Sequence, residues 1–231
     1  MQIIFVLVEP KVPENVGAAA RALKTMGHSR LWIVNSQAHQ EPQAQWLAHG
    51  SQDILEQIET LPDLQAVRDR VELVVGTSAK PRHGREEWHP PQTLRRALGN
   101  KSDNSGQVAL VFGPEERGLS NEELALCDLL TGIPLKVRYP SLNLAQAVML
   151  YAYELASASP DTAARPTATE TTLRPLIDRM EALLPQIDTP RDGKLAHWLF
   201  ERLPLLTSRD IGFLHTLCQN LERTLRQGRK Q

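Results

Sequence analysis

The 231-residue sequence lacks several features that would each define a class of protein. It has no apolar run near the roughly 18 residues of a membrane-spanning helix. The apolar residues 3–8 have neither the basic flank nor the cleavage site of a secretory signal. Its two cysteines, Cys127 and Cys218, are too far apart for a disulfide framework, and His215 with Cys218 supplies only two of the four ligands of a structural zinc. We expect a reduced, cytoplasmic protein without a membrane segment or a metal.

The sequence also lacks an excess of charge of one sign. It contains 26 Lys and Arg against 27 Asp and Glu, so a polyanionic partner cannot be inferred from net charge and would have to bind a local patch. Aromatic residues make up only 5%, but 41% of the residues are hydrophobic, which is ordinary for a globular chain. The length suits one good-sized domain with a small appendage.

Short apolar segments alternate with amphipathic ones over the first two thirds of the chain. We predict strands at 2–8, 31–34, 71–76, 107–112 and 130–135. We predict helices at 13–26 and near 42–49, 52–58, 62–69 and 91–98. Continuous apolar strands that alternate with helices indicate an α/β fold, with a parallel sheet covered by helices on both faces.

The second half of the chain becomes increasingly helical. Ser120 and Glu123 form a capping box, and Ser141 is expected to start a long helix at 142–157. Small and polar residues with proline then mark a linker. The sequence thus predicts a domain at 1–157, a linker at 158–172 and a helical extension at 173–231. The apolar stripes of that extension allow dimerisation, RNA docking or simple packing onto the first domain.

Three polar or glycine-bearing junctions follow the carboxyl ends of predicted strands, where α/β sheets bind their ligands. They are NVGAAAR at 15–21, GPEERGL at 113–119, and Ile133-Pro134 followed by SLNLA at 141–145. Each has a simpler interpretation as a helix start or a turn. No GxGxxG or GxxxxGK[ST] motif is present, which disfavours a dinucleotide-dependent oxidoreductase or a P-loop ATPase.

In combination, the order NxGxxxR, FGxExxGLS and IPxxxxxxSLNLAxA resembles the SpoU/TrmH family of RNA ribose 2'-O-methyltransferases in the SPOUT class. The segment VVGTSAK at 74–80 and the wider motif sequences are most similar to the TrmJ/LasT branch. The resemblance covers residues 1–157. It implies transfer of a methyl group from S-adenosylmethionine to RNA, most simply tRNA, with rRNA as the alternative. An RNA-binding or regulatory protein that keeps the fold without methyl transfer is a second hypothesis.

The resemblance also implies a C-terminal trefoil knot in the sheet domain, an exception to the usual chain topology. It implies a homodimer with the active site at the interface, and a cofactor bound in the knot loops. A side chain at Gly113 is expected to obstruct the cofactor, and the backbone of Ile133 is expected to bind adenine. The full implied cofactor set is Thr77, Ser78, Ala79, Gly113, Ile133, Ser141, Leu142 and Asn143.

The implied catalytic residues are Arg21, Asn15, Glu115, Ser141 and Asn143. A ribose 2'-hydroxyl is a weak nucleophile at neutral pH, so the enzyme must align it and assist loss of its proton. A guanidinium stays protonated, and Arg21 is therefore expected to hold phosphate and favour the developing alkoxide, while action as a base stays open. Asn15 is expected to orient Arg21 or the ribose, and Glu115 to fix a loop or an arginine.

RNA contacts are expected from the basic segment 78–101. Its candidate RNA-binding residues are Lys80, Arg82 and Arg85, and Trp88 and His89 could stack on bases. The alternative is an ordinary solvated loop and helix face.

Overall fold

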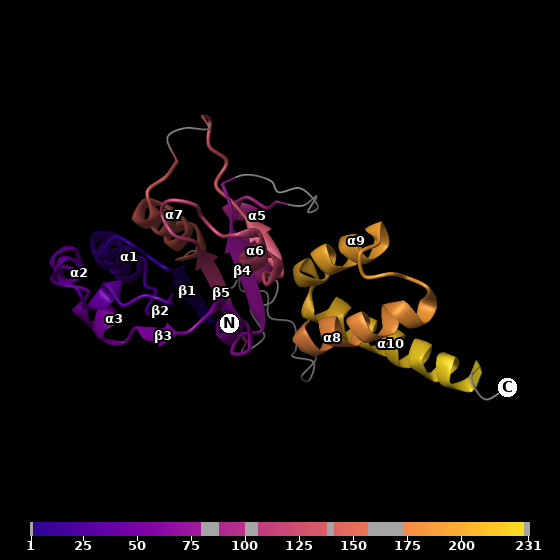
Figure 1. Cartoon of the computed structure of the whole chain (residues 1–231). Coiled ribbons are helices and arrows are strands. Elements are labelled where there is room, and N and C mark those ends of the chain that lie inside the picture. The colour runs from indigo at the N-terminus through magenta and orange to yellow at the C-terminus, as the bar shows by residue number, and fades with distance from the viewer. Residues whose placement is uncertain (1, 80–87, 100–105, 138–140, 157–172, 229–231) are drawn as a thin grey trace.

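The computed structural model describes residues 2–79, 88–99, 106–137, 141–156 and 173–228. Its first part is a six-stranded sheet in the order β3-β2-β1-β5-β4-β6, in which every neighbouring pair is parallel (Figure 1). The strands are β1 Gln2–Val8, β2 Leu31–Val34, β3 Glu59–Leu61, β4 Leu73–Thr77, β5 Gln107–Phe112 and β6 Leu129–Thr131. The predicted parallel α/β sheet is confirmed.

Helices cover both faces of this sheet, because successive side chains of its strands point to opposite faces. Phe5 and Leu7 of β1 belong to one core, while Ile4 and Val6 belong to the other. The first core also contains side chains of α1 Pro13–Thr25, α2 Pro42–Leu47, α3 Gln52–Glu56, α5 Pro91–Gly99 and α7 Leu144–Ala156. The second contains side chains of α4 Leu64–Arg68 and α6 Asn121–Ala125.

Three strands differ from the sequence prediction. The strand expected at 71–76 is β4 Leu73–Thr77. The strand expected at 130–135 spans Leu129–Thr131, and beyond it the Gly132 N–H donates to the His89 carbonyl outside the regular ladder. Strand β3 was not predicted, because three residues are too few for a periodic pattern. The strands at 2–8, 31–34 and 107–112 have their predicted bounds.

Helix ends follow local chemistry. Pro13 occupies the first turn of α1, and Ser120 with Glu123 forms the predicted capping box of α6. The prediction that Ser141 starts the long helix is wrong. Helix α7 begins at Leu144, and Asn143 Oδ1 accepts the Ala145 N–H at 2.8 Å. An Asn side chain satisfies the unpaired amides of the first turn from the position just before it.

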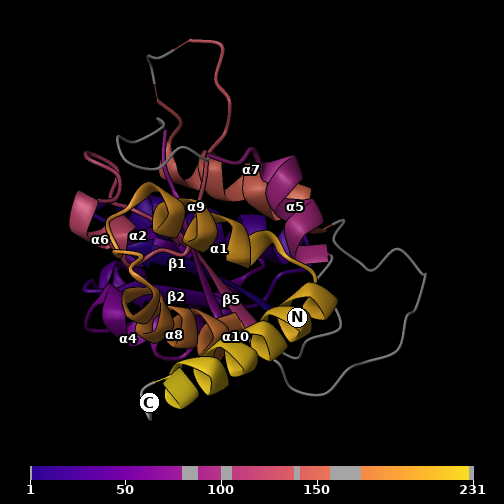
Figure 2. The ribbon, with the colours of Figure 1, turned by 90° about the vertical axis from the view of Figure 1, so that its right-hand side faces the viewer.

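The helical extension comprises α8 Leu173–Leu183, α9 Lys194–Arg202 and α10 Ser208–Gly228, with short 3-10 turns at Leu184–Ile187 and Leu203–Leu205. A further 3-10 turn, Ala38–Gln40, follows β2 in the sheet domain. These helices lie beside the β4/β6 side of the sheet (Figures 1 and 2). At the junction Arg174 donates to both oxygens of Asp128, at 3.0 and 2.7 Å, and the Leu173 N–H donates to Glu72. The described part of the chain contains no helix long and apolar enough to cross a membrane.

Candidate active site

The predicted cofactor residues lie at one edge of the sheet. Strands β5, β4 and β6 are consecutive neighbours, and Gly113, Thr77 and Ile133 stand at or just beyond their carboxyl ends. Neighbouring strands are about 4.8 Å apart, so these loops line a narrow region. Strand β1 pairs with β5 on the other side and leads directly into α1. The chain thus places all three motifs at the upper edge of the sheet in Figure 1.

A chain of hydrogen bonds joins the three motifs. Asn143 Nδ2 donates to Asn15 Oδ1 at 2.8 Å, and Asn15 Nδ2 donates to Glu115 Oε1 at 2.8 Å. Asn15 is buried, with 8% of its surface exposed, so a lost partner there would be costly. Asn15 is therefore held in one fixed arrangement with two residues that lie 100 and 128 positions further along the chain.

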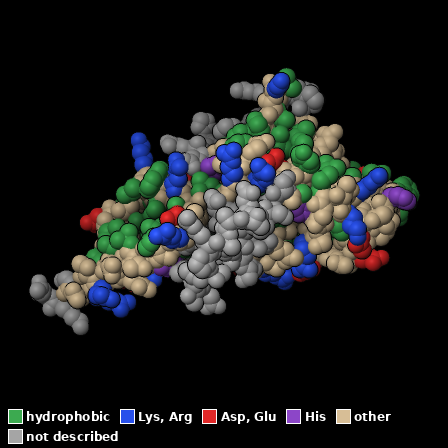
Figure 3. Space-filling model, turned by 180° about the vertical axis from the view of Figure 1, so that it is seen from behind, with side chains coloured by type: hydrophobic (Ala, Val, Ile, Leu, Met, Phe, Trp, Pro, Cys, Tyr) green, Lys and Arg blue, Asp and Glu red, His purple; other side chains and the backbone are tan. Residues whose placement is uncertain are grey.

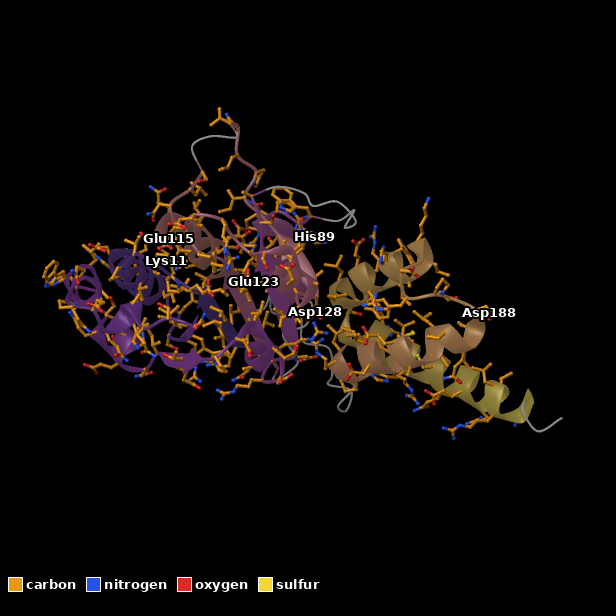
Figure 4. All side chains as sticks on the ribbon, viewed as in Figure 1. Lys11, His89, Glu115, Glu123, Asp128 and Asp188 are labelled. Carbon is orange, nitrogen blue, oxygen red and sulfur yellow. The ribbon has the colours of Figure 1, made fainter. Side chains whose placement is uncertain are left out.

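Glu115 anchors the segment that enters α1. Its carboxylate also accepts the backbone N–H groups of Lys11, at 3.0 Å, and Val12, at 3.3 Å. Figure 4 places Glu115 beside Lys11. Burial disfavours the ionised carboxyl, but the bonds from Asn15 and from the two amides outweigh it, so the pKa of Glu115 lies below its usual value. Of the two predicted roles for Glu115, these contacts support the fixing of a loop.

Arg21 is exposed on α1, two turns beyond Asn15. Six helical residues correspond to a rise of about 9 Å and a rotation of about 240°, so the two side chains leave different faces of the helix. The amide of Asn15 bonds with Glu115 and Asn143. Asn15 is therefore oriented toward the other two motifs, and the structure does not support the expectation that it orients Arg21.

The fold of its own loop requires a glycine at Gly113, in addition to the expected need for space beside the cofactor. A Cβ at this position would lie 2.2 Å from the carbonyl carbon of Gly118 and 2.2 Å from the backbone nitrogen of Leu119. The loop 113–119 therefore folds back against its own first residue. A side chain would displace this loop, which carries Glu115, whatever ligand is bound.

The remaining predicted cofactor residues range from half-buried to exposed. Thr77 Oγ1 donates to the Val111 carbonyl at 2.9 Å, and the Ser78 N–H donates to the Thr131 carbonyl at 2.9 Å. Ala79 and Ser141 are exposed, and Leu142 and Ile133 are half-buried. These loops offer small side chains and backbone groups rather than charges, which suits a site that reads an adenine edge through the backbone.

The predicted RNA-binding residues Lys80, Arg82 and Arg85 lie outside the described residues. Trp88 is described, and it packs against Gly132 and the Ser78 carbonyl. His89 lies at the same edge of the sheet as Glu115 (Figure 4).

Sequence reasoning missed a second group of polar side chains that joins separate segments at this edge. Arg117 donates to Glu9, at 3.2 Å, and to both carboxylate oxygens of Glu123, at 2.9 and 3.2 Å. Glu9 and Asn35 adopt left-handed backbone conformations, with φ of 46° and 50°, and Asn35 Nδ2 donates to Glu9 at 2.8 Å. The only signal in the sequence was the position of Arg117 between Glu115 and Gly118. Its acidic partner Glu9 follows a different strand, and no local pattern links the two.

A parallel sheet with small-residue loops at three adjacent strand ends, joined by hydrogen bonds through the buried Asn15, is the architecture of an α/β protein that binds a ligand at the carboxyl edge of its sheet. Residues 2–153 match the SpoU rRNA Methylase family, and residues 170–225 match the C-terminal domain of tRNA/rRNA methyltransferase LasT. The chain belongs to the SpoU rRNA Methylase family. It is an RNA methyltransferase that uses S-adenosylmethionine.

Its relatives match over most of their length. The chain is 46% identical to the uncharacterized tRNA/rRNA methyltransferase LasT of Escherichia coli (strain K12), covering 97% of this chain and 99% of the relative. It is 39% identical to the tRNA (cytidine/uridine-2'-O-)-methyltransferase TrmJ of Klebsiella pneumoniae, covering 80% and 72%. The solved structure of a probable methylase family protein from Haemophilus influenzae superimposes with a TM-score of 0.70 at 29% identity, covering 98% of each chain.

Proposed function

We propose that this methyltransferase modifies a ribose 2'-hydroxyl of tRNA. The observation that carries the proposal is the hydrogen-bonded set Glu115–Asn15–Asn143, which brings the three family motifs together at the carboxyl edge of the sheet. The TrmJ relatives, which are named tRNA (cytidine/uridine-2'-O-)-methyltransferases, support both the 2'-oxygen and tRNA. An enzyme of tRNA modification works where tRNA is, so we place it in the cytoplasm.

The proposed cofactor residues are those predicted from sequence, in the loops after β4, β5 and β6 and at the start of α7. Bound there, S-adenosylmethionine would supply an electrophilic methyl group. The chain must then hold the ribose oxygen in line with that group and favour its loss of a proton. The new O–CH3 bond forms as the S–CH3 bond breaks, which leaves S-adenosylhomocysteine and a proton.

Arg21 is the proposed catalytic residue. Its side chain is exposed on the helix that Asn15 anchors, so it can reach an RNA phosphate and the developing alkoxide. A planar guanidinium binds phosphate through paired hydrogen bonds and stays charged. We assign Asn15 and Glu115 to holding the loops, and Ser141 and Asn143 to the wall between the cofactor and the ribose.

The proposed enzyme is a homodimer with its active site at the interface. Helix α7 buries one face in the core, yet three large apolar side chains on its outer side are exposed: Met149 37%, Leu150 43% and Tyr153 64%. Val12, next to the Glu115 anchor, is also exposed at 39%. Figure 3 shows hydrophobic side chains gathered on this side of the molecule, with Lys and Arg beside them. An apolar patch that adjoins the site is typical of a protein interface.

The proposed organisation keeps a knotted methyltransferase domain at 1–157, a linker at 158–172 and a helical extension at 173–231. The match of 170–225 to a separate C-terminal domain model and the helices α8, α9 and α10 support the third unit.

The decisive experiment is methyl transfer from labelled S-adenosylmethionine to bulk tRNA, followed by mass spectrometry of nucleosides. We expect a 2'-O-methylated nucleoside. Label in rRNA alone would overturn the choice of tRNA. Binding of cofactor and RNA with no transfer to either would favour the regulatory alternative.

A further inference from the structure

Trp88 stands outside the three motifs, yet it contacts two of the loops proposed to bind the cofactor. Its indole Nε1 donates to the Ser78 carbonyl at 3.0 Å. The ring also lies against Gly132: a Cβ on that glycine would lie 2.3 Å from both Cζ2 and Nε1 of the indole, and 2.2 Å from the Ser78 carbonyl oxygen. The ring, the Ser78 peptide and the Gly132 backbone are therefore packed directly against one another.

The backbone beside Trp88 is fixed by hydrogen bonds to the end of β6. The His89 N–H donates to the Leu130 carbonyl at 3.1 Å, and the His89 carbonyl accepts the Gly132 N–H at 3.0 Å. The same carbonyl accepts the Thr131 hydroxyl at 2.8 Å, and that buried hydroxyl lies 3.0 Å from the Tyr151 hydroxyl of α7. Trp88 is thus carried on a segment that behaves as a short extension of the sheet.

The two loops need such a support. The regular pairing of β4 with β6 ends at Thr77 and Thr131, one residue before Ser78 and Gly132. Beyond that point the Ser78 N–H still donates to the Thr131 carbonyl. The carbonyl on the other side of Ser78 points to the indole, and Gly132 leads directly into Ile133. Indole is rigid and carries a polar N–H, so it can set both a spacing and a direction.

We propose that Trp88 is a positioning residue of the cofactor site, whose indole holds the Ser78 and Gly132–Ile133 loops in the conformation that binds S-adenosylmethionine. This inference rests on the cofactor site assigned above. A site formed before the ligand arrives does not spend binding free energy on ordering its loops. Loss of the indole should therefore weaken cofactor binding without changing the chemistry of the bound complex.

The test compares Trp88→Phe with Trp198→Phe. The first keeps an aromatic ring but removes the N–H donor, and the control changes a tryptophan of α9 that is 54% exposed. For Trp88→Phe we expect the Kd for S-adenosylmethionine by calorimetry, and its KM, to rise about five- to tenfold, the effect of one lost hydrogen bond. We expect kcat at saturating cofactor to stay within about twofold of the wild type. The control should change neither value.

A second variant approaches the same contact from the other side. Gly132→Ala places a methyl group against the indole and Ser78, and we expect it to weaken cofactor binding at least as much. Because that variant could fail to fold, the thermal midpoint Tm of each protein is measured as well. Calorimetry with S-adenosylhomocysteine gives a second binding measurement that needs no RNA.

Three results would overturn the inference. An unchanged Kd for the cofactor in Trp88→Phe would remove its basis. A lower Tm with unchanged affinity would make Trp88 a packing residue only. A raised KM for tRNA with an unchanged Kd for the cofactor would make it an RNA contact. Failure of the wild-type protein to bind S-adenosylmethionine would instead contradict the cofactor site itself.

Discussion

Glu115 at the carboxyl edge of the sheet and Asp128 at the junction with the C-terminal helices each join distant segments of the chain, but only Asp128 does so with charged partners. At the edge, Glu115 accepts hydrogen bonds from uncharged groups, the Asn15 amide and two backbone N–H groups. At the junction, Asp128, whose side chain is only 5% exposed, meets the guanidinium groups of Arg174 and Arg68. Neutral donors hold a loop without consuming positive charge, and this leaves Arg21 available for an anionic substrate. At the junction, opposite charges form a fixed contact between the sheet domain and α8.

The largest expected effect tests whether Arg21, at the carboxyl edge of the sheet, binds an anionic substrate. Arg21→Ala removes the proposed partner of the phosphate and the alkoxide. Loss of one such group commonly lowers the rate by about 100-fold or more. We expect methyl transfer to tRNA to fall by at least that factor, while the Kd for S-adenosylmethionine by calorimetry is unchanged.

Arg21→Lys serves as the matched control. It keeps the charge but loses the paired hydrogen bonds, so we expect an intermediate rate. Equal loss of transfer and of cofactor binding in Arg21→Ala would point to a structural arginine instead.

The next effect tests the junction. Asp128→Ala leaves Arg174, whose side chain is 20% exposed, without its carboxylate. Breaking a buried pair costs about 3–5 kcal/mol, and with part of Arg174 in water we expect the free energy of unfolding to fall by about 2–3 kcal/mol. Urea denaturation measures it. The control Glu181→Gln breaks the exposed pair with Arg191 and should cost less than about 1 kcal/mol. Similar losses in both would contradict the contrast.

A smaller effect separates the two roles of Asn143. Asn143→Asp keeps an oxygen to cap α7 but cannot donate to Asn15, whereas Asn143→Ala loses both bonds. We expect both variants to reduce kcat about tenfold, and only Asn143→Ala to lose roughly 1 kcal/mol of stability with its cap. An active Asn143→Asp enzyme would show that the bridge to Asn15 is dispensable.

The smallest effect is a pH dependence. Folding lowers the pKa of Glu115, so its ionised form contributes stability above the usual carboxyl range, and this contribution disappears as the pH falls through the lowered value. We expect wild-type Tm to exceed that of Glu115→Gln at pH 7, and the gap to close below about pH 4. A gap that persists in acid would mean that shape, and not charge, holds the loop.

How much of the molecule could be predicted depended on the range of the interactions. The buried strands at 31–34 and 107–112 have the predicted bounds, because continuous apolar runs are strong local signals. Strand β3 was missed, since its three residues become a strand only by pairing with β2. The start of α7 was misplaced by two residues, as Ser141 and Asn143 are both good caps and the contact with Asn15 favours the second.

The site was partly predictable for the same reason. The resemblance named Asn15, Glu115 and Asn143 together, and the structure places them in hydrogen-bond contact. It did not indicate that a side chain at Gly113 would also collide with Gly118 and Leu119, because these residues approach only when the loop folds back. Trp88 was only a candidate for stacking on bases, since nothing in the sequence indicates that residue 132 lies against it.

The order of apolar and polar residues determined by itself that this chain forms a parallel α/β sheet, and the motifs at its strand ends determined its family. These are properties of short segments, where periodicity and turn chemistry act over a few residues. Only the tertiary structure decided that Asn15 faces Glu115 and Asn143 and not Arg21, and that an indole lies between Ser78 and Gly132. Hydrogen bonds and packing between distant segments depend on how strands are ordered in the sheet, which no local pattern specifies.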